Sequence, residues 1–305
     1  MSENNLAAET AFHDELVRHR LIIPTGVPGV FGRGPVFEDV LHRFDALVSA
    51  SASKDGAESM HFPPVLSRKV FEKSEFLDSF PQLAGSVWSF HGTDAQHKEL
   101  SERVHAGKDW SDLQSMTEVV LAPAACYPVY PTIAGTLPPE GRLVDITNYC
   151  FRHEPSPDPA RMQMFRVHEY VRAGDPEMVT AWRGMWLARG IELLTSLGLP
   201  AVAVTASDPF FGRGGRLLAI NQKDQQLKFE VVVPICSTEK PTAVVSFNYH
   251  QDHFGSLFGI RTHTGQTAHT ACLGFGLERV VMALMKTHGF IPVEWPADVR
   301  KKLWP

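Results

Sequence analysis

Residues 151–172 read FRHEPSPDPARMQMFRVHEYVR, and this stretch has two dissimilar parts. Its ends are rich in Phe, Met, Val and Tyr, whereas its centre, PSPDPA, holds three prolines. Because proline cannot donate to a ladder and is excluded from central strands, the pattern predicts a strand, a tight loop and a second strand.

Side chains suited to a nucleotide share a face of this predicted hairpin. On the first strand, Arg152 and Glu154 differ by two positions and lie on one face. On the second, Arg161, Phe165 and Glu169 are all odd-numbered and do the same. Arginine pairs with phosphate oxygens, an aromatic ring stacks on a base, and a carboxylate accepts from an exocyclic amine. The second set also has a spacing of four, which equally fits ordinary neighbours on one helix face.

A second informative stretch, ACLGFGLERVVMALMKTHG, covers residues 271–289. Two glycines, Gly274 and Gly276, precede an apolar helix, and Arg279 falls in its first turn, where the helix dipole also favours an anion. The same glycines fit close packing of a strand against a helix, so this motif alone leaves both interpretations open.

In the rest of the sequence, short apolar runs alternate with turns, and only a few segments have a helical pattern. Strands outnumber helices without strict βα alternation, which favours an α+β domain with an antiparallel sheet flanked by helices. The strands are expected at 118–122, 143–147, 201–205, 228–235 and 243–247, and the helices at 7–20, 37–47, 177–197 and 277–287.

Composition narrows the class of protein. The 305 residues carry a formal net charge of −5 and are 44% hydrophobic, so they can bury a full core and show no basic excess for gripping a long nucleic acid. No run of about 18 apolar residues and no signal segment is present, so we expect a cytoplasmic protein with reduced thiols. The four cysteines, Cys126, Cys150, Cys236 and Cys272, form no C-x-x-C pair.

In order along the chain, three stretches resemble the signature motifs of class II aminoacyl-tRNA synthetases. FRHE at 151–154 and RMQMF at 161–165 resemble motif 2, and GFGLER at 274–279 resembles motif 3. GAESMHFPPVL at 56–66 resembles motif 1, with Pro64 in the place of the proline at the dimer interface. The resemblance implies the class II fold, a homodimer, and a catalytic domain over residues 56–305 that follows a helical and loop appendage over 1–55.

Within that class the chain is most similar to the rare zinc-dependent seryl-tRNA synthetases and to the amino acid:[carrier protein] ligases related to them. The phrases that carry this likeness are LAPAACYP (121–128), DITNYCFRHE (145–154), RVHEYVR (166–172) and SFNYHQDHFG (246–255). Ordinary seryl enzymes hold the substrate amine with a Thr-x-Glu in the first phrase. Here Ala124 and Cys126 stand at those two positions.

The resemblance implies a zinc site formed by Cys126, Glu169 and Cys272. Three protein ligands and one open position are typical of a catalytic rather than a structural zinc site. The open position would take the substrate α-amine. The residues alone leave a rival set open, in which His263, His269 and Cys272 bind the metal. Cys150 and Cys236 are expected to be core residues.

The resemblance also implies roles in binding ATP with magnesium. Arg152 would hold the α-phosphate and the substrate carboxylate, and Arg279 the γ-phosphate. Phe165 would stack on adenine while Glu154 reads its amino group. The residues expected to bind ATP are thus Glu154, Arg161 and Phe165, and Glu230 is expected to bind the magnesium ion. Attack of the substrate carboxylate on the α-phosphorus would give aminoacyl-AMP and pyrophosphate.

The acceptor is expected to be a carrier protein rather than tRNA. Only about 55 residues precede the motif 1-like stretch, without a basic arm, and six residues separate Glu154 from Arg161 in the motif 2 loop. A glycine-hinged helix within residues 208–227, with Arg213, Arg216 and Lys223, suits an acidic carrier protein or equally a solvated surface.

We therefore expect an amino acid–[acyl-carrier-protein] ligase that forms a thioester on phosphopantetheine. The alternatives are a zinc-dependent seryl-tRNA synthetase and a non-catalytic sensor of amino acid or nucleotide. Glycine or alanine is favoured as substrate, then serine, with Ala124, Ser246 and Asn248 in the pocket.

Overall fold

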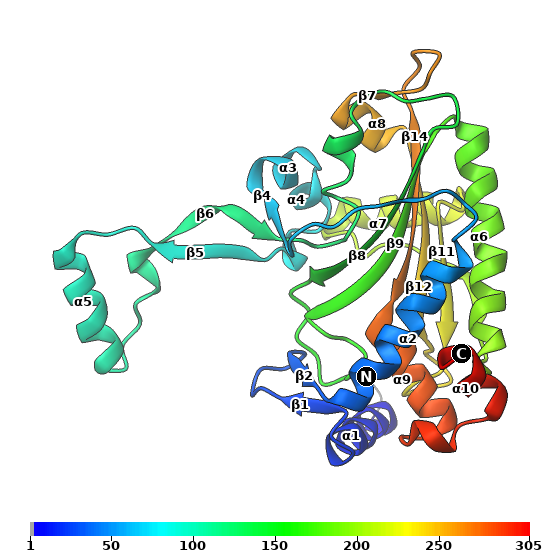
Figure 1. The fold of residues 1–305 in the computed structure, drawn as a ribbon. Coiled ribbons are helices and arrows are strands. Elements are labelled where there is room, and N and C mark those ends of the chain that lie inside the picture. The colour runs from blue at the N-terminus through cyan, green and yellow to red at the C-terminus, as the bar shows by residue number, and fades with distance from the viewer. Residues whose placement is uncertain (1–2) are drawn as a thin grey trace.

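A seven-stranded sheet forms the centre of the computed structural model, which describes residues 3–305 (Figure 1). Neighbouring strands are antiparallel except for the short edge strand β3, which runs parallel to β8. This architecture, a sheet with helices on it, confirms the expected α+β class. In spatial order the strands are β10 (Val202–Thr205), β11 (Lys228–Val233), β12 (Thr242–Gln251), β14 (His269–Gly276), β9 (Met164–Gly174), β8 (Arg142–Phe151) and β3 (Glu58–Ser59).

One face of the sheet packs against helices. Alternate side chains of the central strands, among them Tyr170, Phe247 and Phe275, are fully buried there in the main core. Trp186 of helix α6 stacks on Tyr170 with ring centroids 4.9 Å apart. The covering helices are α2 (Pro35–Ser51), α6 (Pro176–Ser196), α9 (Leu277–His288) and α10 (Ala297–Leu303).

The hairpin predicted from residues 151–172 is formed by β8 and β9, with Ile146 opposite Glu169. Its strands are shorter at the loop end than expected. Because β8 ends at Phe151 and β9 begins at Met164, Arg152, Glu154 and Arg161 lie in the connecting segment and not on the strands. The three prolines in this segment explain why the ladder stops early.

The second face of the sheet is partly covered by a smaller core around Tyr130, Phe254 and Phe258. Tyr130 stacks on Phe254 with ring centroids 4.1 Å apart. The elements that build this side are β4 (Val65–Ser67), α3 (Arg68–Lys73), α4 (Phe76–Ser79), η1 (Pro81–Leu83), η3 (Tyr130–Ile133), β7 (Gly135–Thr136), α8 (His253–Phe258) and β13 (Ile260–Arg261). Helix α7 (Gly212–Asp224) and the one-turn η4 (Pro292–Glu294) complete the body.

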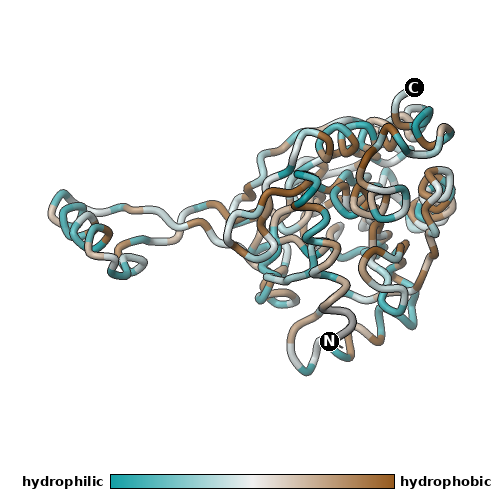
Figure 2. Tube along the Cα trace, turned by 90° about the horizontal axis from the view of Figure 1, so that it is seen from below, coloured by the Kyte–Doolittle hydropathy of each residue, from teal (hydrophilic) through white to brown (hydrophobic). Residues whose placement is uncertain are grey.

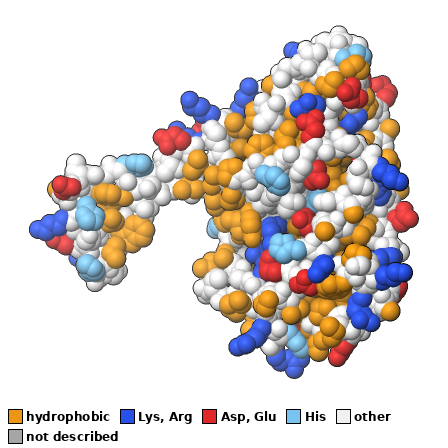
Figure 3. Space-filling model, in the orientation of Figure 1, with side chains coloured by type: hydrophobic (Ala, Val, Ile, Leu, Met, Phe, Trp, Pro, Cys, Tyr) orange, Lys and Arg blue, Asp and Glu red, His pale blue; other side chains and the backbone are white. Residues whose placement is uncertain are grey.

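An arm that sequence patterning did not indicate extends from the body (Figures 1 and 2). Helix α5 at its tip has no buried residue and begins with a capping box between Thr93 and Gln96. Figure 3 shows hydrophobic side chains on the arm's surface, and the exposed ones include Trp88 and Met116, which face each other across its two strands. The arm consists of β5 (Ser86–Phe90), α5 (Asp94–His105), η2 (Ser111–Leu113) and β6 (Gln114–Leu121).

The N-terminal elements α1 (Glu3–Arg18), β1 (Ile22–Pro24) and β2 (Phe31–Arg33) pack on the body rather than apart from it. Phe12 and Leu16 of α1 belong to the main core. The loop between β1 and β2 contacts the motif 2-like segment, where the Gln163 backbone N–H donates to Gly29 O at 2.7 Å and its side chain to Pro28 O at 2.8 Å. The boundary drawn at residue 55 stays a prediction. No helix in residues 3–305 is long and apolar enough to cross a membrane.

Candidate active site

The strand residues expected to carry chemistry share the sheet face opposite the large helices. Cross-strand pairing puts Asn248 opposite Cys272 on β14, and Gly274 opposite Glu169 on β9. Since paired residues and every second residue share a face, these positions form one continuous surface. A Cβ at Gly274 would meet Val167 Cγ1 at 2.9 Å and Glu169 Cγ at 3.1 Å, so this glycine leaves room for the carboxylate.

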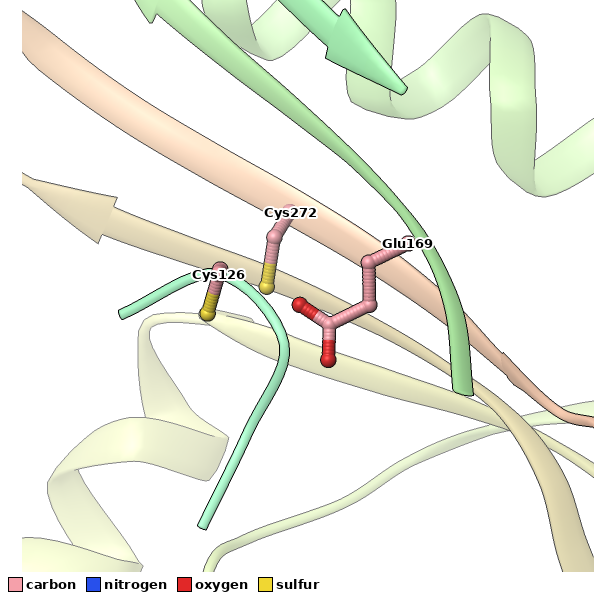
Figure 4. Close-up of side chains that lie close together, drawn as sticks. All are labelled: Cys126, Glu169 and Cys272. Carbon is pink, nitrogen blue, oxygen red and sulfur yellow. The ribbon is translucent and has the colours of Figure 1, made fainter. Parts of the chain in front are cut away.

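Cys126, Glu169 and Cys272 lie close together, as Figure 4 shows. One ligand atom from each lies within 4.8 Å of the others, and all three residues are buried. Cys126 comes from the loop after β6, whereas Glu169 and Cys272 come from neighbouring strands of the sheet. Three segments distant in sequence thus deliver two thiols and one carboxylate to one point.

The electrostatics of this cluster fit a bound cation. Burial, and next the Cys272 charge, raise the pKa of Glu169 to about 8, while a hydrogen bond from Cys126 lowers the pKa of Cys272. Glu169 Oε1 accepts from the Ala125 backbone N–H at 3.2 Å, but the buried Oε2 has no hydrogen-bond partner in the described structure. A buried polar atom without a partner is costly, and a metal ion would satisfy it. Two thiolates and a carboxylate are a ligand set that zinc accepts.

Two side chains that sequence reasoning missed border the cluster. His250 Nε2 lies 3.6 Å from Cys272 Sγ, and its Nδ1 lies 3.1 Å from the Thr270 hydroxyl. Tyr130 is buried beside Cys126, and a hydrogen bond between the two side chains contributes to the pKa of each. His250 could have been predicted to lie on this face, because it is even-numbered like Ser246 and Asn248 and the side chains of a strand alternate between faces. Tyr130 carried no such signal, because it lies in an irregular segment.

The structure does not bring together the rival set of His263, His269 and Cys272. His263 is exposed and lies near Asp175, and the His269 Nδ1 contacts the Tyr249 hydroxyl at 2.5 Å. Among the described residues, one group of three ligating side chains is close enough to share an ion. It consists of Cys126, Glu169 and Cys272.

The motif 2-like side chains gather at the end of the β8–β9 hairpin. The Arg152 guanidinium lies over the Phe165 ring, 5.7 Å from its centroid, and its Nε donates to Pro123 O at 3.1 Å. Arg161 and Glu154 form an ion pair at 3.3 Å. An aromatic ring can stack on a base, and guanidinium groups can pair with phosphate oxygens, so these side chains suit a nucleotide.

Arg279 of the motif 3-like helix reaches the same segment. Its Nε donates to Ala160 O at 2.8 Å and one terminal nitrogen to Ala243 O at 3.0 Å. Burial, together with the nearby positive charges of Arg161 and Arg152, lowers its pKa. Three guanidinium groups held near one another repel, and this cost falls when an anion such as a polyphosphate lies between them.

The remaining predicted residues lie around this surface. Asn248 Nδ2 donates to Cys272 Sγ at 3.5 Å, and Ala124 lies in the same loop as Cys126. Ser246 pairs across strands with Glu230, whose carboxylate lies 3.3 Å from the Lys228 ammonium. Cys150 and Cys236 contribute to the packing: Cys150 is fully buried in the smaller core, and Cys236 is partly buried against the main one.

Comparison with known proteins identifies close relatives. The chain is 45% identical over 283 residues to amino acid–[acyl-carrier-protein] ligase 1 of Bradyrhizobium diazoefficiens, which covers 92% of this chain and 86% of that protein. It is 44% identical over 280 residues to ligase 2 of the same organism, with 91% and 84% covered. A type-2 serine–tRNA ligase of Methanopyrus kandleri is 32% identical over 286 residues, 85% of this chain and 53% of that protein. No family model matches the chain.

Solved structures show the same fold. The M. kandleri seryl-tRNA synthetase, in a crystal structure with A. aeolicus tRNASec, superposes with a TM-score of 0.81 at 24% identity, over 96% of this chain and 60% of that one. Seryl-tRNA synthetase from Pyrococcus horikoshii, solved with ATP, gives a TM-score of 0.67 at 17% identity, over 91% and 58%. The fold is that of class II aminoacyl-tRNA synthetases, and on its sequence identity to the two Bradyrhizobium proteins the chain belongs to the family of amino acid–[acyl-carrier-protein] ligases.

Proposed function

We propose that this protein activates a small amino acid with ATP and transfers the aminoacyl group to the phosphopantetheine thiol of a carrier protein. The observation that carries the proposal is that the structure holds both a group of three neighbouring guanidinium groups near an aromatic ring and a separate buried Cys–Glu–Cys cluster. The first set suits ATP and the second suits an amino acid. The names of its close relatives describe ligation of an amino acid to an acyl-carrier protein.

Residues near the β8–β9 hairpin end bind ATP and orient it for reaction with the substrate carboxylate. Phe165 stacks on adenine, Glu154 accepts from its exocyclic amine, and Arg161 holds the phosphate chain. Arg279 neutralises the γ-phosphate, while Arg152 draws the α-phosphate and the substrate carboxylate together for in-line attack. Such positioning and charge neutralisation can supply most of the rate enhancement of phosphoryl and adenylyl transfer. Magnesium accompanies the ATP, with Glu230 as its proposed protein ligand.

On the amino acid side, Cys126, Glu169 and Cys272 would hold zinc. Zinc bound there supplies a Lewis acid for the unprotonated α-amine, which selects amino acids over other carboxylic acids. Ala124, Ser246 and Asn248 line the place left for the side chain. Glycine or alanine is the proposed substrate, then serine.

Helix α7 is the proposed docking surface for the carrier protein. Its exposed apolar side chains lie beside basic ones, and carrier proteins are acidic, so charge and apolar contact act together. The apolar members are Phe211, Leu217, Leu218 and Ile220, exposed by 50–71%, and the basic members are Arg213, Arg216 and Lys223. The short motif 2 loop leaves the aminoacyl site reachable by a narrow arm.

We also propose a homodimer formed through residues 56–66 around Pro64. This segment includes the edge strand β3, where an unpaired ladder is open to a second chain. The exposed Trp88 and Met116 of the arm offer further apolar surface to the same partner.

ATP–pyrophosphate exchange against a panel of amino acids tests the activation step. The proposal predicts amino-acid-dependent exchange with glycine, alanine or serine. Binding of amino acid or nucleotide without exchange would instead indicate a sensor.

A further inference from the structure

Helix α7 rests on the body along a narrow strip. Gly215 is its one buried residue, and Ala219 and Gln222, further along the same face, are partly buried. A Cβ at Gly215 would meet the carbonyl carbon and oxygen of Phe210 at 2.7 Å, so the helix can pack this close to the segment that precedes it only with glycine there. Much of the remaining helix surface, including Leu217 and Ile220, is exposed.

The helix is fastened at both ends. At its N-terminal end, Phe210 stacks on Phe80 with centroids 5.1 Å apart, and the Phe211 backbone N–H donates to Ser79 O at 2.9 Å. Towards its C-terminal end, Gln222 makes a two-point contact with Asp208: the Asp208 backbone N–H donates to Gln222 Oε1 at 2.7 Å, and Gln222 Nε2 donates to Asp208 Oδ2 at 2.8 Å.

The contact between Gln222 and Asp208 is continued by further contacts that reach the candidate active site. Asp208 Oδ1 accepts from the ammonium group of Lys228, which is 9% exposed and also lies 3.3 Å from Glu230. Lys228 is paired across strands with Asn248, and Asn248 donates to Cys272 Sγ at 3.5 Å. A continuous run of contacts therefore joins the surface helix to the Cys–Glu–Cys cluster.

We propose that the contact of Gln222 with Asp208, anchored by Lys228, is a latch that fixes the docking helix relative to the aminoacyl site. This inference rests on the proposed function. A carrier's arm has a fixed length, so its thiol reaches the aminoacyl-adenylate only when the docking surface is held at one distance and angle. Gln222 and Asp208 are thus positioning residues for the transfer step and do not touch the reacting atoms.

The helix itself provides a matched pair of substitutions. Gln222→Leu removes both hydrogen bonds and leaves the Asp208 N–H and Oδ2 without these partners. Gln225→Leu makes the same chemical change at the C-cap that directly follows the helix, but the Gln225 side chain bonds only with Asn221 and Gln251 at the exposed surface. Neither residue lies among those that bind ATP or amino acid.

Two measurements test the latch. Hydrogen exchange of the backbone amides in residues 212–224 should be about tenfold faster in Gln222→Leu than in wild type, since lost hydrogen bonds to a partly buried group favour local opening, and unchanged in Gln225→Leu. Transfer to a holo-acyl carrier protein should fall about tenfold in Gln222→Leu through a higher KM for the carrier. ATP–pyrophosphate exchange, and aminoacylation of free pantetheine, which does not dock, should remain within about twofold of wild type.

Equal hydrogen exchange in the two variants, or normal carrier loading by Gln222→Leu, would overturn the latch. A parallel loss of pyrophosphate exchange would also overturn it, because the contact would then support activation rather than docking. Failure of the wild-type enzyme to load any holo-carrier would overturn the proposed function itself, and this inference with it.

Discussion

Glu278 joins helix α9 to strand β9, because its buried carboxylate accepts two hydrogen bonds from Arg166. Glu278 Oε2 accepts from the Arg166 backbone N–H at 2.7 Å, and Oε1 accepts from the Arg166 Nε at 3.0 Å. Arg33 of the N-terminal elements also lies 3.1 Å from Oε1. Since Arg279 is the next residue in helix α9, this carboxylate locks the helix to β9, and the Arg33 contact ties the N-terminal elements to both.

Replacing Glu278 by glutamine should therefore lower both stability and activity. Loss of the charge leaves Arg33 and Arg166 without a fully buried counter-ion, and removing one partner of a buried pair costs about 3–5 kcal/mol. Urea unfolding measures the change. Glu38→Gln is the control, because Glu38 also pairs with Arg166 but is partly exposed, and it should cost less. An unchanged unfolding free energy in Glu278→Gln would contradict this account.

The zinc proposal predicts about one metal ion per chain in the wild type and little in Cys126→Ser or Cys272→Ser. Removing one of three protein ligands greatly weakens a bound metal. Metal analysis of the purified proteins, with circular dichroism to check folding, measures the loss. Cys236→Ser and His269→Ala should keep the ion. Full occupancy in both ligand variants would refute the site.

The nucleotide site predicts that Arg152→Ala and Arg279→Ala abolish amino acid activation. A charge clamp on the transition state contributes several kcal/mol, or about a thousandfold in rate. ATP–pyrophosphate exchange measures the effect. Arg43→Ala, which breaks the surface pair with Asp39, should exchange normally. Near-normal exchange in either site variant would show that motif 2 or motif 3 has been misplaced.

The docking surface predicts that Leu217→Asp weakens carrier loading and spares activation. Leu217 is 71% exposed, so the substitution puts a negative charge among the basic residues without disturbing a core. Its repulsion of an acidic carrier should raise the KM for the carrier about tenfold or more. Val293→Asp, at an apolar position equally exposed in η4, is the control. Equal KM values for the two variants would argue that carriers dock elsewhere.

Much of the site was predictable because its residues lie in local motifs on regular strands. Glu169 and Phe165 follow strand alternation, and the even-numbered pair Asn248 and Cys272 meets across β12 and β14. Local pattern did not place Cys126, which reaches the cluster from an irregular loop and was identified only through the resemblance to a known family.

The parts that sequence did not predict depend on long-range contacts or on weak local signals. Glu278 is separated from Arg166 by 112 residues, so no periodicity could pair them. Lys228 and Asp208 meet because α7 folds back between them. The arm helix α5 has no apolar stripe, and its capping box was the one available signal.

Loading of a holo-carrier protein tests the central claim most directly. The enzyme is given ATP, magnesium and radiolabelled amino acid, with holo-carrier, apo-carrier and total tRNA side by side. The account predicts label on the holo-carrier alone, released by conditions that cleave thioesters, because the deprotonated phosphopantetheine thiol attacks the aminoacyl carbonyl and AMP leaves. Label on tRNA that survives those conditions, with the holo-carrier unlabelled, would contradict it.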